Sequence, residues 1–142
     1  MNKIQSLADY LHIEPSSVVP VDWDDCVFED TIEHAQYLVL TDEEADTRLQ
    51  AEIRESVWAF NPDFIAEHSS VCSANRTAFA EFFKIAQEKL CELANPLLLS
   101  IIDDFDEFVA DAEAADGRAH FLAQYDDKEI ELGDGLYAYR VG

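Results

Sequence analysis

The sequence predicts an α+β fold, with about four to five helices packed on a C-terminal three-stranded antiparallel sheet. Apolar residues recur at helical spacing over much of the chain as far as residue 116. Short extended runs separated by turn-forming residues follow Gly117. A chain of 142 residues has the length of one domain, so we expect a single α+β domain over residues 1–142.

The first part of the chain is expected to hold a helix, an acidic loop and a strand. Apolar residues from Ile4 to Leu11 recur at helical spacing and predict a short N-terminal helix. The stretch VDWDDCVFEDTIEHA, residues 21–35, has no clear period and predicts an ordered acidic loop with partial helix. QYLVL, residues 36–40, is typical of a short buried strand.

Polar motifs predict where the middle helices begin. Thr41 and Glu44 form a capping box, and the helix after it should bury Ala45, Leu49, Ile53, Val57 and Phe60. Asn61-Pro62 and Asn95-Pro96 each pair an Asn cap with a Pro at the first helical position. Between them, residues 73–94 predict a helix with Phe79, Phe82, Phe83, Ala86, Leu90 and Leu93 along one buried side.

The C-terminal part changes from a helix to strands. The helix that follows the Asn95-Pro96 cap should run to about Ala115, and Gly117 supplies a left-handed stop. The three runs AHFLAQY, KEIEL and LYAYRV predict a meander with turns at Asp126-Asp127 and at Gly133-Asp134-Gly135.

Charge narrows the classes of partner. The chain has 31 acidic and 9 basic residues and a formal net charge of -22. Nucleic acid and anionic membranes would be repelled as direct partners, whereas a basic protein, or a protein that holds nucleic acid, would be attracted. The same acidity is also typical of halophilic adaptation and of selection for solubility, and this alternative stays open.

The stretch SIIDDFDEFVADAEAAD, residues 100–116, concentrates seven carboxylates without a Lys or Arg. On a helical wheel its apolar residues share one arc, and Asp103, Asp104, Glu107 and Asp111 form the tightest acidic line. With a rise of about 1.5 Å per residue, the stretch carries about one charge per 3 Å, close to the 3.4 Å spacing in one strand of B-DNA. This density predicts a DNA mimic.

Candidate partner-binding residues fall in two segments. The acidic helix contributes Asp103, Asp104, Asp106, Glu107, Asp111 and Glu113, and the acidic loop contributes Asp22, Asp24, Asp25, Glu29 and Asp30. Trp23 within the loop is the expected exposed anchor at an interface.

No pattern in the sequence is typical of an active site, and we expect no catalytic, cofactor-binding or metal-binding residue. The acids from Asp22 begin like a calcium loop but lack the Gly that such a loop needs. His68 and Cys72 are four residues apart but no CxxC or HxxxH pair supports a zinc site. Cys26, Cys72 and Cys91 are interpreted as small buried hydrophobes of a reducing compartment, and without a secretory apolar run we expect a cytoplasmic location.

Three stretches resemble a set of small acidic proteins encoded by phages and prophages. They are YLVLTDEEAD (37–46), SVWAFNPDFIAEH (56–68) and DGRAHFLAQYDDKEIEL (116–132), which are similar to a LTDEEAD helix start, a WAFN segment and a DGRGHFL strand in that set. Ala119 stands where the set has Gly. The resemblance implies a phage-encoded inhibitor of host defence, of the anti-CRISPR or anti-restriction type, that acts in the host cytoplasm.

Together these observations lead us to expect a non-enzymatic DNA mimic that binds the basic nucleic-acid-binding surface of a host-defence complex, such as a CRISPR effector or a restriction enzyme. The alternative is an acidic protein-interaction module whose charge serves solubility or halophilic adaptation. Both a monomer and a homodimer are compatible with the sequence.

Overall fold

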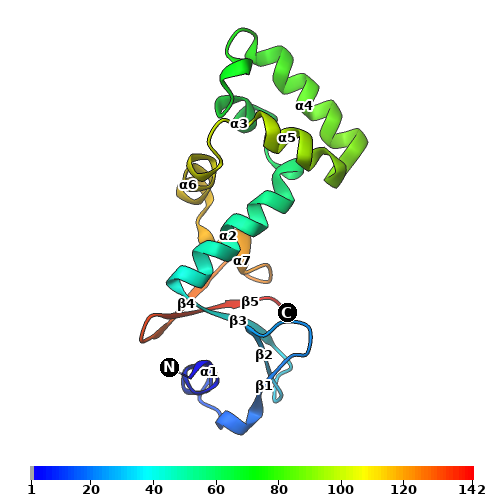
Figure 1. Ribbon diagram of the computed structural model, residues 1–142. Helices are drawn as coiled ribbons and strands as arrows, with labels where there is room; N and C mark the ends of the chain where they lie inside the picture. Colours follow the sequence, from blue (N-terminus) through cyan, green and yellow to red (C-terminus); the bar gives the residue numbers. More distant parts are fainter. Residues whose placement is uncertain (1) are drawn as a thin grey trace. The chain divides into compact units, whose positions relative to one another are not determined.

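The structure, a computed structural model, describes residues 2–142 and is α+β with a five-stranded antiparallel sheet (Figure 1). The helices are α1 (Lys3–Leu11), α2 (Asp42–Ser56), α3 (Pro62–Glu67), α4 (Arg76–Leu90), α5 (Asn95–Ile101), α6 (Phe105–Asp116) and α7 (Arg118–Leu122). The strands are β1 (Val18–Pro20), β2 (Val27–Asp30), β3 (Gln36–Thr41), β4 (Glu129–Gly133) and β5 (Leu136–Arg140). Short 3-10 turns are η1 (Pro15–Ser17), η2 (Val57–Ala59), η3 (Ser70–Cys72) and η4 (Cys91–Ala94).

The chain divides into two compact units. Met1–Leu49 and Asp116–Gly142 form the first unit, and Gln50–Ala115 forms the second. The first unit holds the whole sheet with α1, α7 and the beginning of α2, whereas the second unit consists of helices and 3-10 turns. The single-domain expectation stays a prediction.

The sheet draws its strands from both ends of the chain, in the order β1-β2-β3-β5-β4. The predicted three-stranded C-terminal sheet was therefore wrong in detail. KEIEL and LYAYRV do form β4 and β5, but AHFLAQY lies largely in α7. VFED, inside the segment expected to be a loop with partial helix, forms β2 and pairs with β3.

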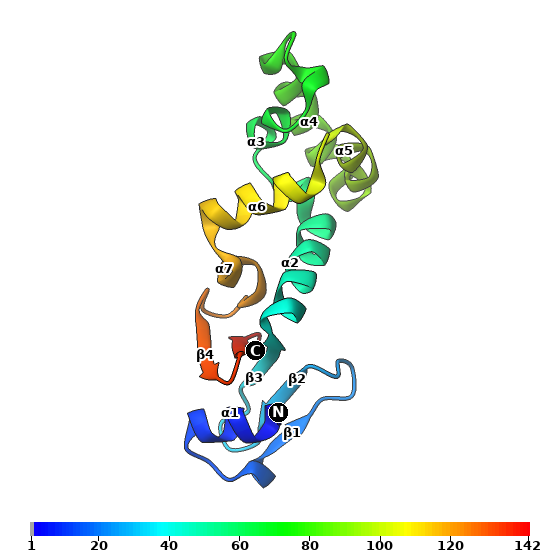
Figure 2. The same cartoon turned by 60° about the vertical axis from the view of Figure 1, so that its left-hand side comes forward.

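The predicted strand at QYLVL is β3, the central strand, and it is buried on both faces. Tyr37 and Val39 lie in one apolar cluster with Leu7 of α1. Leu38 and Leu40 lie in another cluster, with Ala45 of α2 and Leu122 and Ala123 at the end of α7. Helices thus cover both faces of the sheet (Figure 2), and this explains why the run is continuously apolar instead of alternating.

Helices begin at all three predicted places, and two of the three predicted caps are confirmed. The Thr41 amide donates to Glu44 Oε1 at 2.9 Å and the Glu44 amide to Thr41 Oγ1 at 3.2 Å, which is a complete capping box. Asn61 caps α3. Asn95 does not cap a helix, because its side chain accepts the Trp58 amide and donates to the Glu55 carbonyl.

The helix predicted over residues 73–94 is α4, which is shorter and only partly buried along the expected side. Phe83 and Ala86 are buried, but Phe82, Leu90 and Leu93 are exposed, as is Leu97 in α5. α4 ends at Leu90, where Cys91 takes a positive φ of 50°. Cys91 is exposed, Cys26 is partly exposed and Cys72 is buried, so only one of the three cysteines has the predicted burial.

Candidate acidic binding surfaces

The acidic stretch is not the single continuous helix that its periodicity predicts. α5 ends at Ile101 and α6 begins at Phe105, because groups around the break take other partners. The Asp103 amide donates to the His68 carbonyl at 2.9 Å, and the Asp103 carboxylate accepts the Ser70 amide at 2.8 Å. Asp104 Oδ1 accepts the Glu107 amide at 3.2 Å and so caps α6. Short Asp side chains compete with helical hydrogen bonds in this way, so the pair ends one helix and starts the next.

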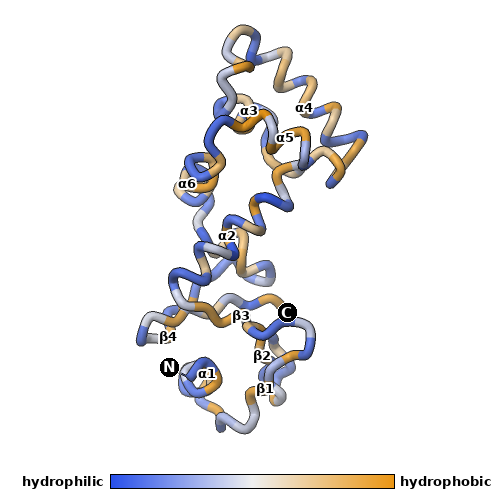
Figure 3. The backbone as a smooth tube through the Cα atoms, in the orientation of Figure 1, coloured by the Kyte–Doolittle hydropathy of each residue, from blue (hydrophilic) through white to orange (hydrophobic). Residues whose placement is uncertain are grey.

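The apolar side of α6 packs around Phe108. The Phe108 ring centroid lies 5.1 Å from that of Phe60 and 5.0 Å from that of Phe64. Val109 and Ala112 are buried on the same side. The predicted amphipathic character is confirmed for these residues, and Figure 3 shows hydrophobic and hydrophilic residues alternating around α6.

The acids within α6 form two rows on its outer side. By helical geometry Glu107 and Asp111 flank the exposed Ala110 and Ala114 on one side, and Asp106 and Glu113 flank them on the other. With Asp116, five carboxylates occupy the 12 residues of α6, about one per 3.6 Å of a helix that is about 18 Å long. The charge density of α6 therefore stays close to that of a DNA strand although the longer helix is broken.

No Lys or Arg among residues 2–142 forms an ion pair with the seven acids of residues 103–116. Asp111 is paired with a His, since its Oδ2 lies 3.2 Å from His68 Nε2, and Asp106 accepts a 3.5 Å hydrogen bond from Gln50. The basic side chains that pair with acids do so elsewhere: Lys3 with Glu44, Arg48 with Asp24, Arg76 with Glu67, and Arg118 with three carboxylates. The negative charge of α6 is thus left uncompensated.

Several acids of the loop are committed to the fold of the first unit. Asp24 accepts two hydrogen bonds of 2.8 Å from Arg48, and these hold the pKa of Asp24 below its usual range. Asp30 is 3 % exposed and its carboxylate accepts the Ile32 amide at 2.8 Å. Glu29 lies near His34 and Gln36. These three carboxylates have local partners that explain their presence.

The outermost groups of the loop are Asp22, Trp23 and Asp25. Trp23 is 64 % exposed, as expected for an interface anchor. Asp22 and Asp25 are exposed, and neither forms a hydrogen bond or ion pair with any of residues 2–142. An exposed aromatic ring in the same segment as two free carboxylates can contact a cationic surface by cation–π attraction and by charge.

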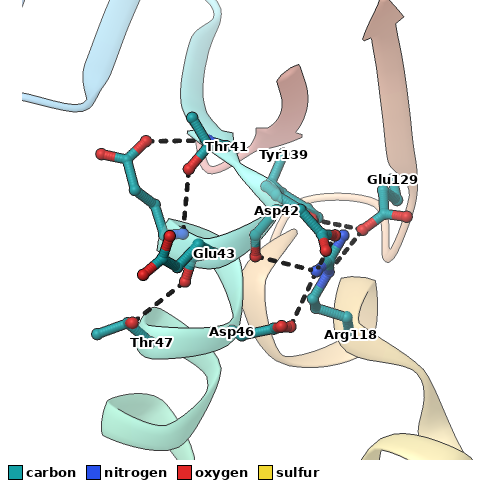
Figure 4. Close-up of polar contacts among 9 residues, drawn as sticks. Thr41, Asp42, Glu43, Asp46, Thr47, Arg118, Glu129 and Tyr139 are labelled. Carbon is teal, nitrogen blue, oxygen red and sulfur yellow. Dashed lines mark hydrogen bonds and ion pairs between the residues drawn. The ribbon is translucent and has the colours of Figure 1, made fainter. Parts of the chain in front are cut away.

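The sequence interpretation missed a network centred on Arg118 (Figure 4). Arg118 Nη1 donates to Asp42 at 2.9 Å and to Asp46 at 3.0 Å, and its Nε donates to Glu129 at 2.9 Å. The Tyr139 hydroxyl donates to the same Glu129 carboxylate. Burial alone would lower the pKa of Arg118, but the hydrogen bonds to Asp42 and Glu129 outweigh it and raise that pKa. The Nε and Nη1 groups thus bind acceptors from α2 and β4, which favours a structural role for Arg118.

The described part of the chain contains neither a candidate metal site nor a helix that could span a membrane. No group of three or more His, Cys, Asp or Glu side chains within residues 2–142 is placed to hold a metal ion. Over the same residues, every helix is too short or too polar to cross a bilayer.

No protein-family model, curated protein or solved structure matches the chain. The residues that bear on function are therefore those of the chain itself, above all the uncompensated carboxylates of α6.

Proposed function

We propose that the protein is a non-enzymatic acidic inhibitor that binds the basic nucleic-acid-binding surface of a host-defence complex, such as a CRISPR effector or a restriction enzyme. In this proposal the protein is phage-encoded and acts in the host cytoplasm. α6 occupies the place of a nucleic-acid strand, and its carboxylates meet the Lys and Arg side chains that would otherwise contact phosphates. The observation that carries the proposal is the outer face of α6, where none of the Lys and Arg side chains in residues 2–142 pairs with the acids.

The spacing of charge on α6 supports a nucleic-acid-like role. About one carboxylate per 3.6 Å of helix resembles the phosphate spacing of a single strand, 3.4 Å. A channel that binds nucleic acid presents a positive potential of several kT, so it attracts such a ridge at long range. Like charges that follow one another on a helix lower its own stability, and a binding role would explain why they are retained.

The contact residues are fewer than the sequence suggests. Asp106, Glu107, Asp111 and Glu113 form the proposed contact set of α6, while Asp103 and Asp104 add negative charge but hold the break before the helix. In the acidic loop, Asp22, Trp23 and Asp25 are the proposed contacts. Asp24, Glu29 and Asp30 are left out because they have partners within the first unit and their side chains are mostly buried, whereas Asp111, although paired with His68, is 54 % exposed.

A charge-matched pair of variants tests the proposal. The α6 variant carries Asp106→Asn, Glu107→Gln, Asp111→Asn and Glu113→Gln. The control variant removes four exposed charges of the first unit by Glu14→Gln, Glu33→Gln, Glu131→Gln and Asp134→Asn. Both have the same net charge, so they differ only in where the charge was removed.

The measurement is affinity capture from a host lysate at low and at high salt, followed by competition of the captured protein with labelled duplex DNA. We expect a nucleic-acid-binding protein that is released by salt, and a loss of affinity of at least about tenfold, or 1.4 kcal/mol, in the α6 variant alone. Equal loss in both variants would favour the alternative, in which acidity serves solubility or halophilic adaptation. If no nucleic-acid-binding protein is captured at low salt, the proposal is wrong.

A further inference from the structure

α4 carries an apolar face that no part of its compact unit covers. Phe82 and Ile85 are 53 % and 56 % exposed, while Phe83 and Ala86, about a quarter turn further round the helix, are buried. Leu93 in η4 and Leu97 in α5 extend the series of exposed apolar side chains. Single exposed apolar residues are ordinary, but several along one helix and the segment after it indicate an interaction surface.

The segment that carries this apolar face has no net charge. Residues 76–101 contain three basic side chains (Arg76, Lys84 and Lys89) and three acidic ones (Glu81, Glu88 and Glu92), so the entire net charge of -22 lies on the rest of the chain. Two copies of such an acidic protein repel each other wherever their acidic surfaces approach. A neutral apolar face is where a second copy can approach without that repulsion.

We propose that α4 packs antiparallel against α4 of a second copy and forms a homodimer with twofold symmetry. With Ile85 at the symmetry axis, Glu81 and Lys89 lie four residues to either side, about 6 Å along the helix. An antiparallel pair then places Glu81 of each copy opposite Lys89 of the other, so the two ion pairs repeat by symmetry. Phe82 and Ile85 supply the apolar contact between these pairs.

The mass of the protein in solution tests the proposal. Sedimentation equilibrium over increasing protein concentration should show a shift from 16.1 kDa to about twice that mass. Added salt should strengthen the dimer, because it screens the repulsion between two acidic chains while apolar contacts persist. Binding to a basic partner weakens with salt, so the dimer and the proposed inhibitor function can fail independently.

Two sets of variants make the test specific. Ile85→Asp should keep the protein at 16.1 kDa, whereas Val71→Asp, at a site that is 60 % exposed in the same unit, should leave the dimer intact. Glu81→Lys or Lys89→Glu alone should weaken the dimer several-fold, and the two together should restore it. Circular dichroism would verify that each variant keeps its helices.

Three outcomes would overturn the proposal. They are a wild-type mass of 16.1 kDa at every concentration and salt, a dimer that survives Ile85→Asp, and a double charge swap that fails to restore association.

Discussion

Arg118 and Asp42 lie 76 positions apart in the chain, and their side chains form an ion pair of 2.9 Å. The same guanidinium holds Asp46 and Glu129, so one side chain ties the first turns of α2 to the start of α7 and to β4. Three carboxylates converge there, and within the described residues Arg118 is the one cation paired with them.

We expect Arg118→Ala to lower the free energy of unfolding by about 2–4 kcal/mol, measured by urea denaturation. The Arg118 side chain is 11 % exposed, and removing it leaves three neighbouring carboxylates without their counter-charge. The value is below the upper limit for fully buried pairs because Asp42 and Asp46 remain largely in water.

Arg76→Ala is the matched control for this substitution. Arg76 pairs with one carboxylate, Glu67, and both side chains are about half exposed, so the expected loss is below about 1 kcal/mol. Similar losses in the two variants would contradict the structural role assigned to Arg118.

The pair of Asp24 and Arg48 should give a stability difference that depends on pH. Hydrogen bonds from Arg48 lower the pKa of Asp24 in the folded protein. The stability that the pair contributes is therefore fully present above the usual Asp pKa of about 3.9, and it is lost as the pH falls through the lower pKa of the folded protein. We expect Asp24→Asn to cost about 1 kcal/mol at pH 7. Urea denaturation should show wild type and variant converging below pH 4, and a constant difference down to pH 2 would contradict the assignment.

Asp104 should stabilise the protein as a helix cap and not through its charge. Because its Oδ1 accepts the Glu107 amide, Asp104→Ala should lower the free energy of unfolding by about 1 kcal/mol. Asp104→Asn keeps an acceptor oxygen, and we expect its thermal midpoint to stay close to that of wild type. If Asn is as damaging as Ala, charge and not capping is responsible. The Asn variant also removes one charge from the acidic face without removing the cap.

Helix caps and strands could be predicted from the sequence where a residue's partners are close in the chain. The capping box of Thr41 and Glu44, the cap at Asn61 and the run at β3 depend on neighbours within a few positions. Each could be predicted because local hydrogen bonding or continuous burial leaves a short pattern.

Features that depend on distant partners could not be predicted in this way. The break before α6 needs Asp103 to meet Ser70 and His68, 33 and 35 positions away, and the wheel for residues 97–116 contains no trace of them. β2 has few β-branched residues and is a strand because it pairs with β3. Likewise, the exposure of Phe82 reflects which side of α4 its unit covers, and periodicity alone does not define that side.

Trp23 allows the field of the acidic loop to be measured directly. Because it is 64 % exposed and lies within two residues of the free carboxylates of Asp22 and Asp25, its fluorescence in a Trp58→Phe background should be quenched strongly by neutral acrylamide and weakly by iodide at low ionic strength. Replacing both carboxylates by Asn should raise the iodide quenching constant about twofold and leave the acrylamide constant unchanged. An unchanged iodide constant would mean that these two acids do not set the local potential, and Trp23 would then lose its assignment as the anchor for a cationic partner.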